Sequence, residues 1–174
     1  MNNIHQYIRD MKQEEWFPIV TPEGETTGKA TRTECHSGSK LLHPVVHLHV
    51  WNAAGELYLQ KRPMHKDIQP GKWDTAVGGH VDYGETVEDA LRREVREELG
   101  ITAFTPEPVG RYVFESAVEK ELVNSYRTVY TGTISPDKDE LDGGRFWSRG
   151  EIEAALGKGV FTPNFESEYK RFFL

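Results

Sequence analysis

The chain has 174 residues, of which 37% are hydrophobic and 28% are charged, as in an ordinary soluble globular protein. This length suffices for one domain with a substantial core and is too short for two. The net charge of −7 does not favour binding to a nucleic acid polymer or to an anionic membrane, both of which are negatively charged. The single cysteine, Cys35, excludes an internal disulfide, and no apolar run approaches the roughly 20 residues of a membrane span. Because the N-terminus also lacks the apolar core of a signal peptide, we expect a cytoplasmic protein.

The first part of the chain is predicted to form an N-terminal extension. Residues 1–14 carry apolar side chains at helical spacing, so we expect a short amphipathic helix or a frayed tail there. Residues 16–20 have the composition of a strand, and residues 28–33 return after a turn that contains Pro and Gly. We therefore assign residues 1–33 to a helix and hairpin extension of one domain that spans residues 1–174.

A second hairpin is predicted in the middle of the chain. Residues 43–51 alternate between an apolar face and a face that carries His47 and His49, which is the pattern of a half-buried strand. We expect these two histidines to be partly exposed on the strand rather than to bind a ligand. Residues 56–61 return as the partner strand, and residues 63–73 form a loop rich in Pro, Gly, Lys and His.

Residues 79–101 carry the most specific pattern in the chain. They read GHVDYGETVEDALRREVREELGI and match the spacing G-x5-E-x7-R-E-U-x-E-E-x-G-U, with U an aliphatic residue, at every position. Thr86 is placed to cap the start of a helix and Gly100 to cap its end, which predicts a helix over residues 87–99. Residues 75–81 run through two glycines and lead into this helix.

Three acidic side chains share one face of this predicted helix. Glu94, Glu97 and Glu98 lie at i, i+3 and i+4. Val95 and Leu99 form an apolar edge beside them, so the face borders buried surface and differs from an ordinary solvated charged face. Neighbouring carboxylates raise one another's pKa unless a cation lies among them. The pattern therefore predicts a site for a hard divalent ion, Mg²⁺ or Mn²⁺.

Beyond the helix the pattern predicts two long strands, an acidic loop, a short strand and two helices. Their expected residues are 109–115, 122–133, 135–144, 145–147, 149–156 and 165–172, with Asn164 as the cap of the last helix. This order of elements is consistent with an α+β protein in which helices cover both sides of a mixed sheet, an α/β/α sandwich.

The pattern over residues 79–101 is the signature of the Nudix hydrolases, and the chain resembles that family. The resemblance implies the Nudix fold and divalent-metal-dependent hydrolysis of a diphosphate that is linked to another group, usually a nucleoside. It implies that the ion, Mg²⁺ or Mn²⁺, is held by Glu94, Glu97, Glu98 and the main-chain carbonyl of Gly79.

The same resemblance assigns further roles around the ion. Glu85 and Arg93 are expected to pair and to hold the loop against the helix. The general base is expected to be Glu98 or Glu97, and Glu140 in the acidic loop is a further candidate. The implied partner is a small-molecule diphosphate; whether the protein forms a homodimer is left open.

A second resemblance, from about residue 32 to residue 101, is to isopentenyl-diphosphate isomerase, which has the Nudix fold and a different reaction. The matching segments are Leu42–Val50, Gly55–Arg62, Lys66, Pro70-Gly71, Trp73 and Gly79-His80. The metal-binding residues of the isomerase map onto His36, His43, His80, Glu119 and Glu121. Its basic residues for diphosphate map onto Arg62 and Lys66, which could equally be solvated loop charges.

The chain departs from the isomerase at the position that matters for catalysis. Where the isomerase has its catalytic cysteine, this chain has Gly78, and the pattern over residues 79–101 is complete here whereas it is degraded in the isomerases. We therefore predict a hydrolase of the isomerase-like branch. The alternatives are an isomerase-like enzyme and a non-catalytic, ligand-sensing Nudix domain. No motif in the sequence selects among nucleotide sugars, dinucleotides, nucleoside diphosphates and coenzyme A as substrate.

Overall fold

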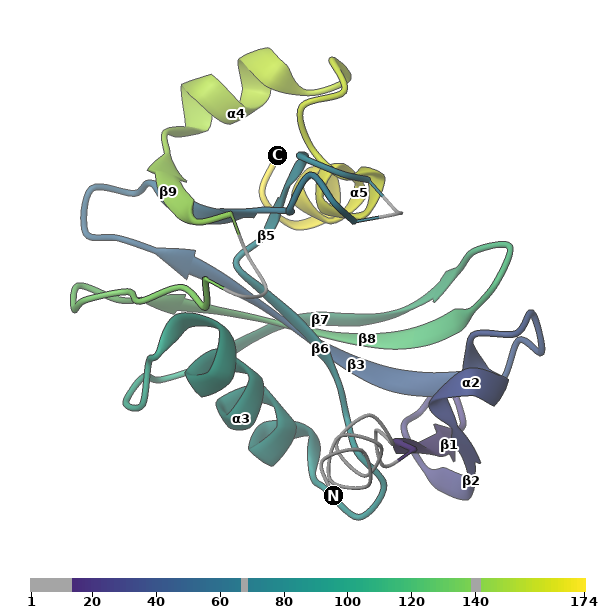
Figure 1. Ribbon diagram of the computed structural model, residues 1–174. Coiled ribbons are helices and arrows are strands. Elements are labelled where there is room, and N and C mark those ends of the chain that lie inside the picture. Colours follow the sequence, from purple (N-terminus) through teal and green to yellow (C-terminus); the bar gives the residue numbers. More distant parts are fainter. Residues whose placement is uncertain (1–13, 67–68, 139–141) are drawn as a thin grey trace, which may run out of the picture.

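The computed structural model describes residues 14–66, 69–138 and 142–174. A mixed β-sheet lies between helix α3 on one face and helices α4 and α5 on the other (Figure 1). The expected α+β arrangement of helices on both sides of a mixed sheet is thereby confirmed. The helix expected within residues 1–14 and the candidate base Glu140 lie outside the described residues. Within those residues, no helix has the length and apolar character needed to cross a membrane.

Nine strands and four helices are assigned within the described residues. The strands are β1 (Trp16–Val20), β2 (Thr26–Thr31), β3 (Leu42–Trp51), β4 (Leu57–Lys61), β5 (Trp73–Thr75), β6 (Val77–His80), β7 (Glu107–Glu115), β8 (Lys120–Val129) and β9 (Gly144–Trp147). The helices are α2 (Arg32–Cys35), α3 (Val87–Leu99), α4 (Arg149–Ala155) and α5 (Pro163–Phe172).

Strand β3 organises the main sheet. The strand order is β5-β4-β3-β8-β7, with β3 parallel to β8 along its whole length and the other pairs antiparallel. On its other edge β3 pairs with β6 through Val45–Leu48 and with β4 only through Val50 and Trp51. Because the edge of β3 changes partner, β4 and β6 diverge, and a cleft opens between them.

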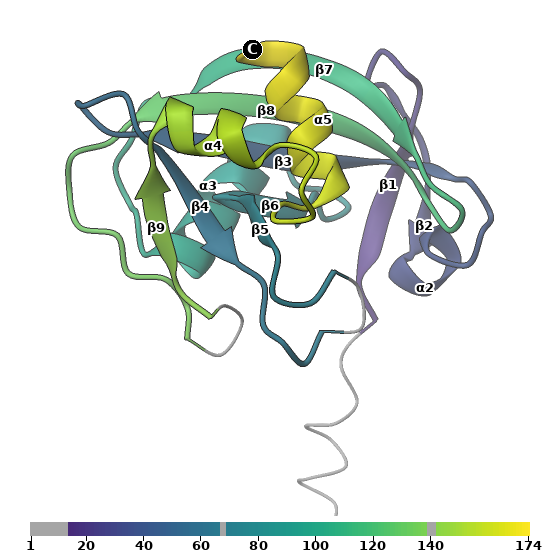
Figure 2. The ribbon, with the colours of Figure 1, turned by 90° about the horizontal axis from the view of Figure 1, so that it is seen from above.

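Both faces of β3 are buried. Val46, Leu48 and Val50 pack against α3, where Leu91 and Val95 are also fully buried. On the opposite side a second core joins the sheet to α5, which crosses β3 and β8 in Figure 2. Burying each such aliphatic side chain contributes about 1.5–3 kcal/mol, so two helix layers and the sheet stabilise one another.

The expectation that His47 and His49 are partly exposed on a half-buried strand is wrong for His49. His49 is fully buried and the side chain of His47 is only 15% exposed. The reason is non-local, because α5 covers this face of β3. The alternation of apolar and polar residues indicated the strand itself correctly.

Two predicted boundaries also differ from the structure. Strand β2 ends at Thr31, because Thr31 forms a capping box with Glu34 at the start of α2. Residues 75–81, to which no element was assigned from the sequence, contain the last residue of β5 and all of β6, and these two strands pair with different neighbours. The cap of α5 is Thr162, whose hydroxyl accepts a hydrogen bond from the Phe165 N–H at 3.2 Å, and not Asn164.

Candidate active site

The cleft between β4 and β6 has a volume of about 1210 Å³ and is lined by charged side chains. Acidic residues of α3 form one part of its wall, and the basic residues Arg62 and Lys66 form another. His47 and His80 also line it. Residues that are distant in the sequence, and that were predicted to bind a cation and a diphosphate, therefore share one cavity.

Helix α3 presents its carboxylates to this cleft because both helix ends are fixed by the sequence. The Thr86 hydroxyl accepts a hydrogen bond from the Asp89 N–H at 3.1 Å, and Gly100 ends the helix with a φ of +68°. The buried apolar stripe then sets the rotation of the helix about its axis. As a result Glu94, Glu97 and Glu98 all line the cleft.

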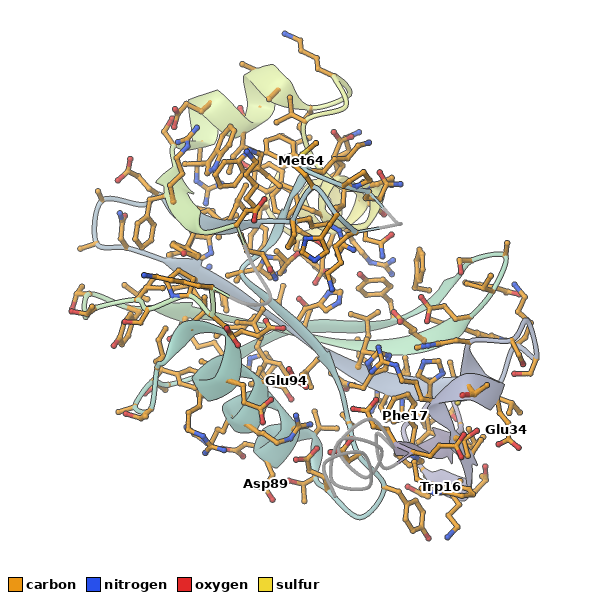
Figure 3. All side chains as sticks on the ribbon, viewed as in Figure 1. Trp16, Phe17, Glu34, Met64, Asp89 and Glu94 are labelled. Carbon is orange, nitrogen blue, oxygen red and sulfur yellow. The ribbon has the colours of Figure 1, made fainter. Side chains whose placement is uncertain are left out.

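The three carboxylates differ in their surroundings. The side chain of Glu94 is 15% exposed and that of Glu97 is 54% exposed, whereas Glu98 as a whole residue is 8% exposed. The Gly78 N–H donates to Glu98 Oε2 at 3.4 Å. In Figure 3 the labelled Glu94 lies on α3, beside strand β6.

Gly79 allows the main chain of β6 to approach Glu94 closely. A Cβ atom at residue 79 would lie 2.2 Å from Glu94 Cδ, so any side chain would displace the carboxylate. At Gly78, by contrast, the nearest heavy atom to an added Cβ is His47 Cδ2 at 3.6 Å, an ordinary contact. The need for glycine at residue 79 is therefore steric.

Arg93 fastens the loop before α3 to the helix. Its guanidinium donates to both oxygens of Glu85, at 2.8 and 2.9 Å, and to Glu94 Oε1 at 2.8 Å. It also donates to the His80 carbonyl at 3.0 Å. These hydrogen bonds lower the pKa of Glu85 and raise that of Arg93. Glu85 and Arg93 are thus paired, and Arg93 links Glu85 to Glu94.

The two basic residues expected to bind phosphate lie at the mouth of the cleft. Arg62 Nη1 is 3.8 Å from Asp74 Oδ2, and Asp74 also accepts a hydrogen bond from the Thr162 hydroxyl at 2.9 Å. Lys66 is exposed on the same loop. Arg62 is therefore oriented by a fixed carboxylate, whereas Lys66 projects toward solvent.

A second group of ligand-type side chains lies at the other end of β3. One ligand atom from each of His36, His43, His80 and Glu119 lies within 4.8 Å of the others. His36 Nε2 is 3.0 Å from Glu119 Oε2. Glu121, the fifth residue of this predicted set, is not in the group, although burial and the neighbouring Glu119 raise its pKa to about 7.

His43 and His80 have surroundings that favour the neutral imidazole, the form that binds a metal ion. His43 donates through Nδ1–H to the Leu41 carbonyl at 2.9 Å, which leaves Nε2 as the nitrogen with a lone pair. Burial lowers the pKa of both His43 and His80. The buried Nε2 atoms of these two rings have no hydrogen-bond partner among the described residues. The Phe17 ring stacks on His80 with centroids 4.5 Å apart and so fixes its plane.

Sequence reasoning missed one polar network beside the cleft. Glu168 of α5 is buried and accepts hydrogen bonds from His47, His49 and Tyr112. A signal for it was present: Glu168 lies three residues after Phe165, within the apolar stripe of α5, and an acid at such a position is buried with partners.

This fold, with a carboxylate-bearing helix and basic residues around one cleft, is that of an enzyme acting on phosphate compounds. The NUDIX domain family model matches residues 41–165, and the chain belongs to the Nudix family. It is a Nudix pyrophosphohydrolase, an enzyme that hydrolyses pyrophosphate bonds.

Relatives agree on this family. An uncharacterized Nudix hydrolase of Listeria monocytogenes is 33% identical over 87% of this chain and 90% of its own length. The isopentenyl-diphosphate Δ-isomerase of Escherichia coli is 36% identical over 74% of each chain. The crystal structure of DR0079 from Deinococcus radiodurans superposes with a TM-score of 0.78 and 25% identity, covering 92% of this chain and 100% of that one. The expected isomerase-like branch of the family is thereby confirmed.

Proposed function

We propose that this enzyme hydrolyses a small-molecule diphosphate, a nucleoside diphosphate linked to another group or a similar compound, with Mg²⁺ or Mn²⁺ bound at α3. The observation that carries the proposal is the meeting of the α3 carboxylates with Arg62 and Lys66 in one cleft. An acidic protein needs such an arrangement to bind a polyanion, because the ion and a few local cations must offset its own charge.

The residues present fit a hard divalent cation. Glu94, Glu97 and Glu98 offer only oxygen ligands, and the main chain of Gly79 passes close to Glu94. When bound, the ion would neutralise charge on the diphosphate and lower the pKa of a water ligand.

Protein groups perform the remaining steps. Glu98 or Glu97 accepts the proton of the attacking water, and Arg62 and Lys66 bind oxygens of the diphosphate. The water oxygen bonds to one phosphorus, the bond from that phosphorus to the bridging oxygen breaks, and the bridging oxygen leaves on the other phosphate with the electron pair. Glu85 acts through Arg93, which holds Glu94 in place.

We further propose that His36, His43, His80 and Glu119 bind a second divalent ion. The support is the buried Nε2 atoms of His43 and His80, which have no hydrogen-bond partner among the described residues. Neutral imidazole nitrogen is a preferred ligand of transition metals. Metal analysis of the purified protein, beside the variant His80→Ala, tests this site: the variant should lose the tightly bound transition metal. Equal metal content in both proteins would contradict it.

The test of the hydrolase proposal is a screen with Mg²⁺ and Mn²⁺ in which a phosphatase converts the phosphate monoesters produced into inorganic phosphate, which is then measured. The panel comprises nucleotide sugars, dinucleotides, nucleoside diphosphates and coenzyme A, each treated with the wild type and with Glu98→Gln. We expect metal-dependent hydrolysis of at least one class, lost in the variant. Isopentenyl diphosphate belongs in the panel because the His36 group favours the isomerase-like alternative: its conversion to the allylic isomer by the wild type would overturn our assignment.

A further inference from the structure

A buried carboxylate of α5 lies directly behind the wall of the cleft. Glu168 is 1% exposed. Its Oε2 accepts hydrogen bonds from His47 Nδ1 at 2.6 Å and from the Tyr112 hydroxyl at 3.0 Å, and its Oε1 accepts one from His49 Nε2 at 3.1 Å. The network joins α5 to β3 and β7, three elements that are distant in the sequence.

Stability alone does not account for this network. An ion pair taken out of water contributes little net stability, and apolar residues of similar size often stabilise such a position as well or better. The second core between the sheet and α5 is otherwise built from large apolar side chains. The presence of a carboxylate and two histidines in this layer therefore indicates a functional role in addition to packing.

His47 is the member of the network that reaches the cleft. The side chain of His49 is fully buried, whereas His47 lines the cleft together with Gly78 and Glu98. With Nδ1 directed at Glu168, the opposite edge of the ring faces residue 78: a Cβ added there would lie 3.6 Å from His47 Cδ2 and 3.8 Å from Nε2. Since Gly78 has no side chain, this ring edge is not covered from that side.

We propose that His47 is a substrate-binding residue, which donates a hydrogen bond through Nε2–H to an oxygen of the diphosphate, and that Glu168 is the positioning residue that fixes its ring. The proposal rests on the proposed function, because it concerns the same cleft and the same class of substrate. His47, on β3, would then be a third positively charged residue that contacts the diphosphate, in addition to Arg62 and Lys66 in the loop after β4.

The electrostatics of the ring agree with this role. Burial lowers the pKa of His47, but the adjacent Glu168 more than offsets that effect, with smaller contributions from Glu121 and Asp74, and raises it to about 9. The imidazolium therefore carries hydrogen on both nitrogens at neutral pH. A charge-assisted hydrogen bond to phosphate is shorter and stronger than a neutral one.

The experiment measures binding of methylenediphosphonate, a diphosphate that cannot be hydrolysed, by calorimetry in the presence of Mg²⁺. We expect His47→Gln to weaken binding by roughly ten- to a hundredfold. Lys170→Gln is the control, because it removes one positive charge from the solvent side of the same helix as Glu168. The control should bind like the wild type. Equal affinity of His47→Gln and the wild type would overturn the proposal, as would a wild type that does not bind the probe.

A second measurement uses the wild type and does not depend on the folding of a variant. The ¹⁵N resonances of the His47 ring should show both nitrogens protonated at pH 7.5, and the Nε2 signal should shift when methylenediphosphonate is added. An unchanged signal at saturating probe would contradict the contact. In Tyr112→Phe, which keeps Glu168, we expect the protonated state to persist, whereas Glu168→Gln should leave a neutral ring.

The outcomes separate this inference from the proposed function. If no panel compound is hydrolysed but probe binding depends on His47, the binding residue stands and the hydrolase proposal falls. If hydrolysis is found and His47→Gln alters neither probe affinity nor KM, only the present inference falls.

Discussion

Glu94, Glu97 and Glu98 come from one helix face, yet the structure gives each a different environment. Glu94 is fixed by Arg93, Glu98 lies buried against the Gly78 main chain, and Glu97 is largely exposed. A fixed carboxylate suits the binding of an ion in one geometry, while an exposed one can rotate between the ion and a water molecule. These differences lead us to expect unequal effects when the three are replaced.

Arg62 illustrates how a single side chain is oriented in the cleft. Asp74 holds the guanidinium at the cleft without burying it, because the Arg62 side chain remains 29% exposed. We expect Arg62→Ala to raise KM by roughly ten- to a hundredfold, the value of a charge-assisted hydrogen bond. Arg62→Lys should recover only part of the loss, since lysine cannot form two parallel hydrogen bonds to one phosphate.

Steady-state kinetics on an accepted substrate measure this effect. Arg96→Ala serves as the control, because Arg96 is exposed on α3 and does not line the cleft. An Arg62→Ala enzyme with unaltered KM and kcat would mean that Arg62 is only a solvated loop charge.

At the scale of elements, the contact between β6 and α3 decides the geometry of the carboxylates. A Cβ at residue 79 would overlap Glu94, whereas one at residue 78 would only touch His47. We therefore expect Gly79→Ala to displace Glu94 and to weaken Mg²⁺ binding at least tenfold, and Gly78→Ala to keep the affinity of the wild type. Mg²⁺-dependent shifts in melting temperature compare the pair, because an ion bound only to the folded state stabilises it. Equal shifts in the two variants would contradict the steric argument.

Helices and strands whose ends are set by neighbouring residues could be predicted from the sequence. The ends of α3 agree with the expectation because Thr86, Gly100 and the apolar spacing all lie within a few residues of the helix. Burial on the second face of β3 was not predictable, because it depends on α5, more than a hundred residues later. The convergence of His36 and His43 with His80 and Glu119 likewise depends on strand pairing that spacing alone does not determine. Only the resemblance to the isomerase suggested that group.

At the scale of the whole molecule, the pair of His47 and Glu168 ties the C-terminal helix to the sheet. The folded state raises the pKa of His47 from 6.5 to about 9, so its stabilisation is fully present below pH 6.5 and is lost as the pH rises through 9. Glu168 has a lowered pKa, so its contribution is present above pH 4.5 and is lost as the pH falls.

The pair therefore predicts a pH-dependent stability between pH 6.5 and 9.5. We expect the melting temperature of the wild type to fall by several degrees more over this range than that of His47→Gln, which lacks the titrating group. Thermal unfolding of both proteins at a series of pH values gives the comparison. If the melting temperatures of the two proteins change in parallel with pH, the pKa of His47 is not raised by its surroundings in the folded state.

The central claim is that carboxylates of α3 hold the ion on which hydrolysis depends, and turnover as a function of Mg²⁺ concentration tests it most directly. The comparison is between the wild type, Glu98→Gln and Glu88→Gln. Glu88 is an exposed carboxylate on the same helix and pairs with Arg92 across one turn. We predict that Glu98→Gln retains the fold but loses at least about a hundredfold in kcat at every Mg²⁺ concentration, and that Glu88→Gln follows the wild type. A Glu98→Gln enzyme that keeps most of its turnover, with the Mg²⁺ dependence of the wild type, would contradict the account.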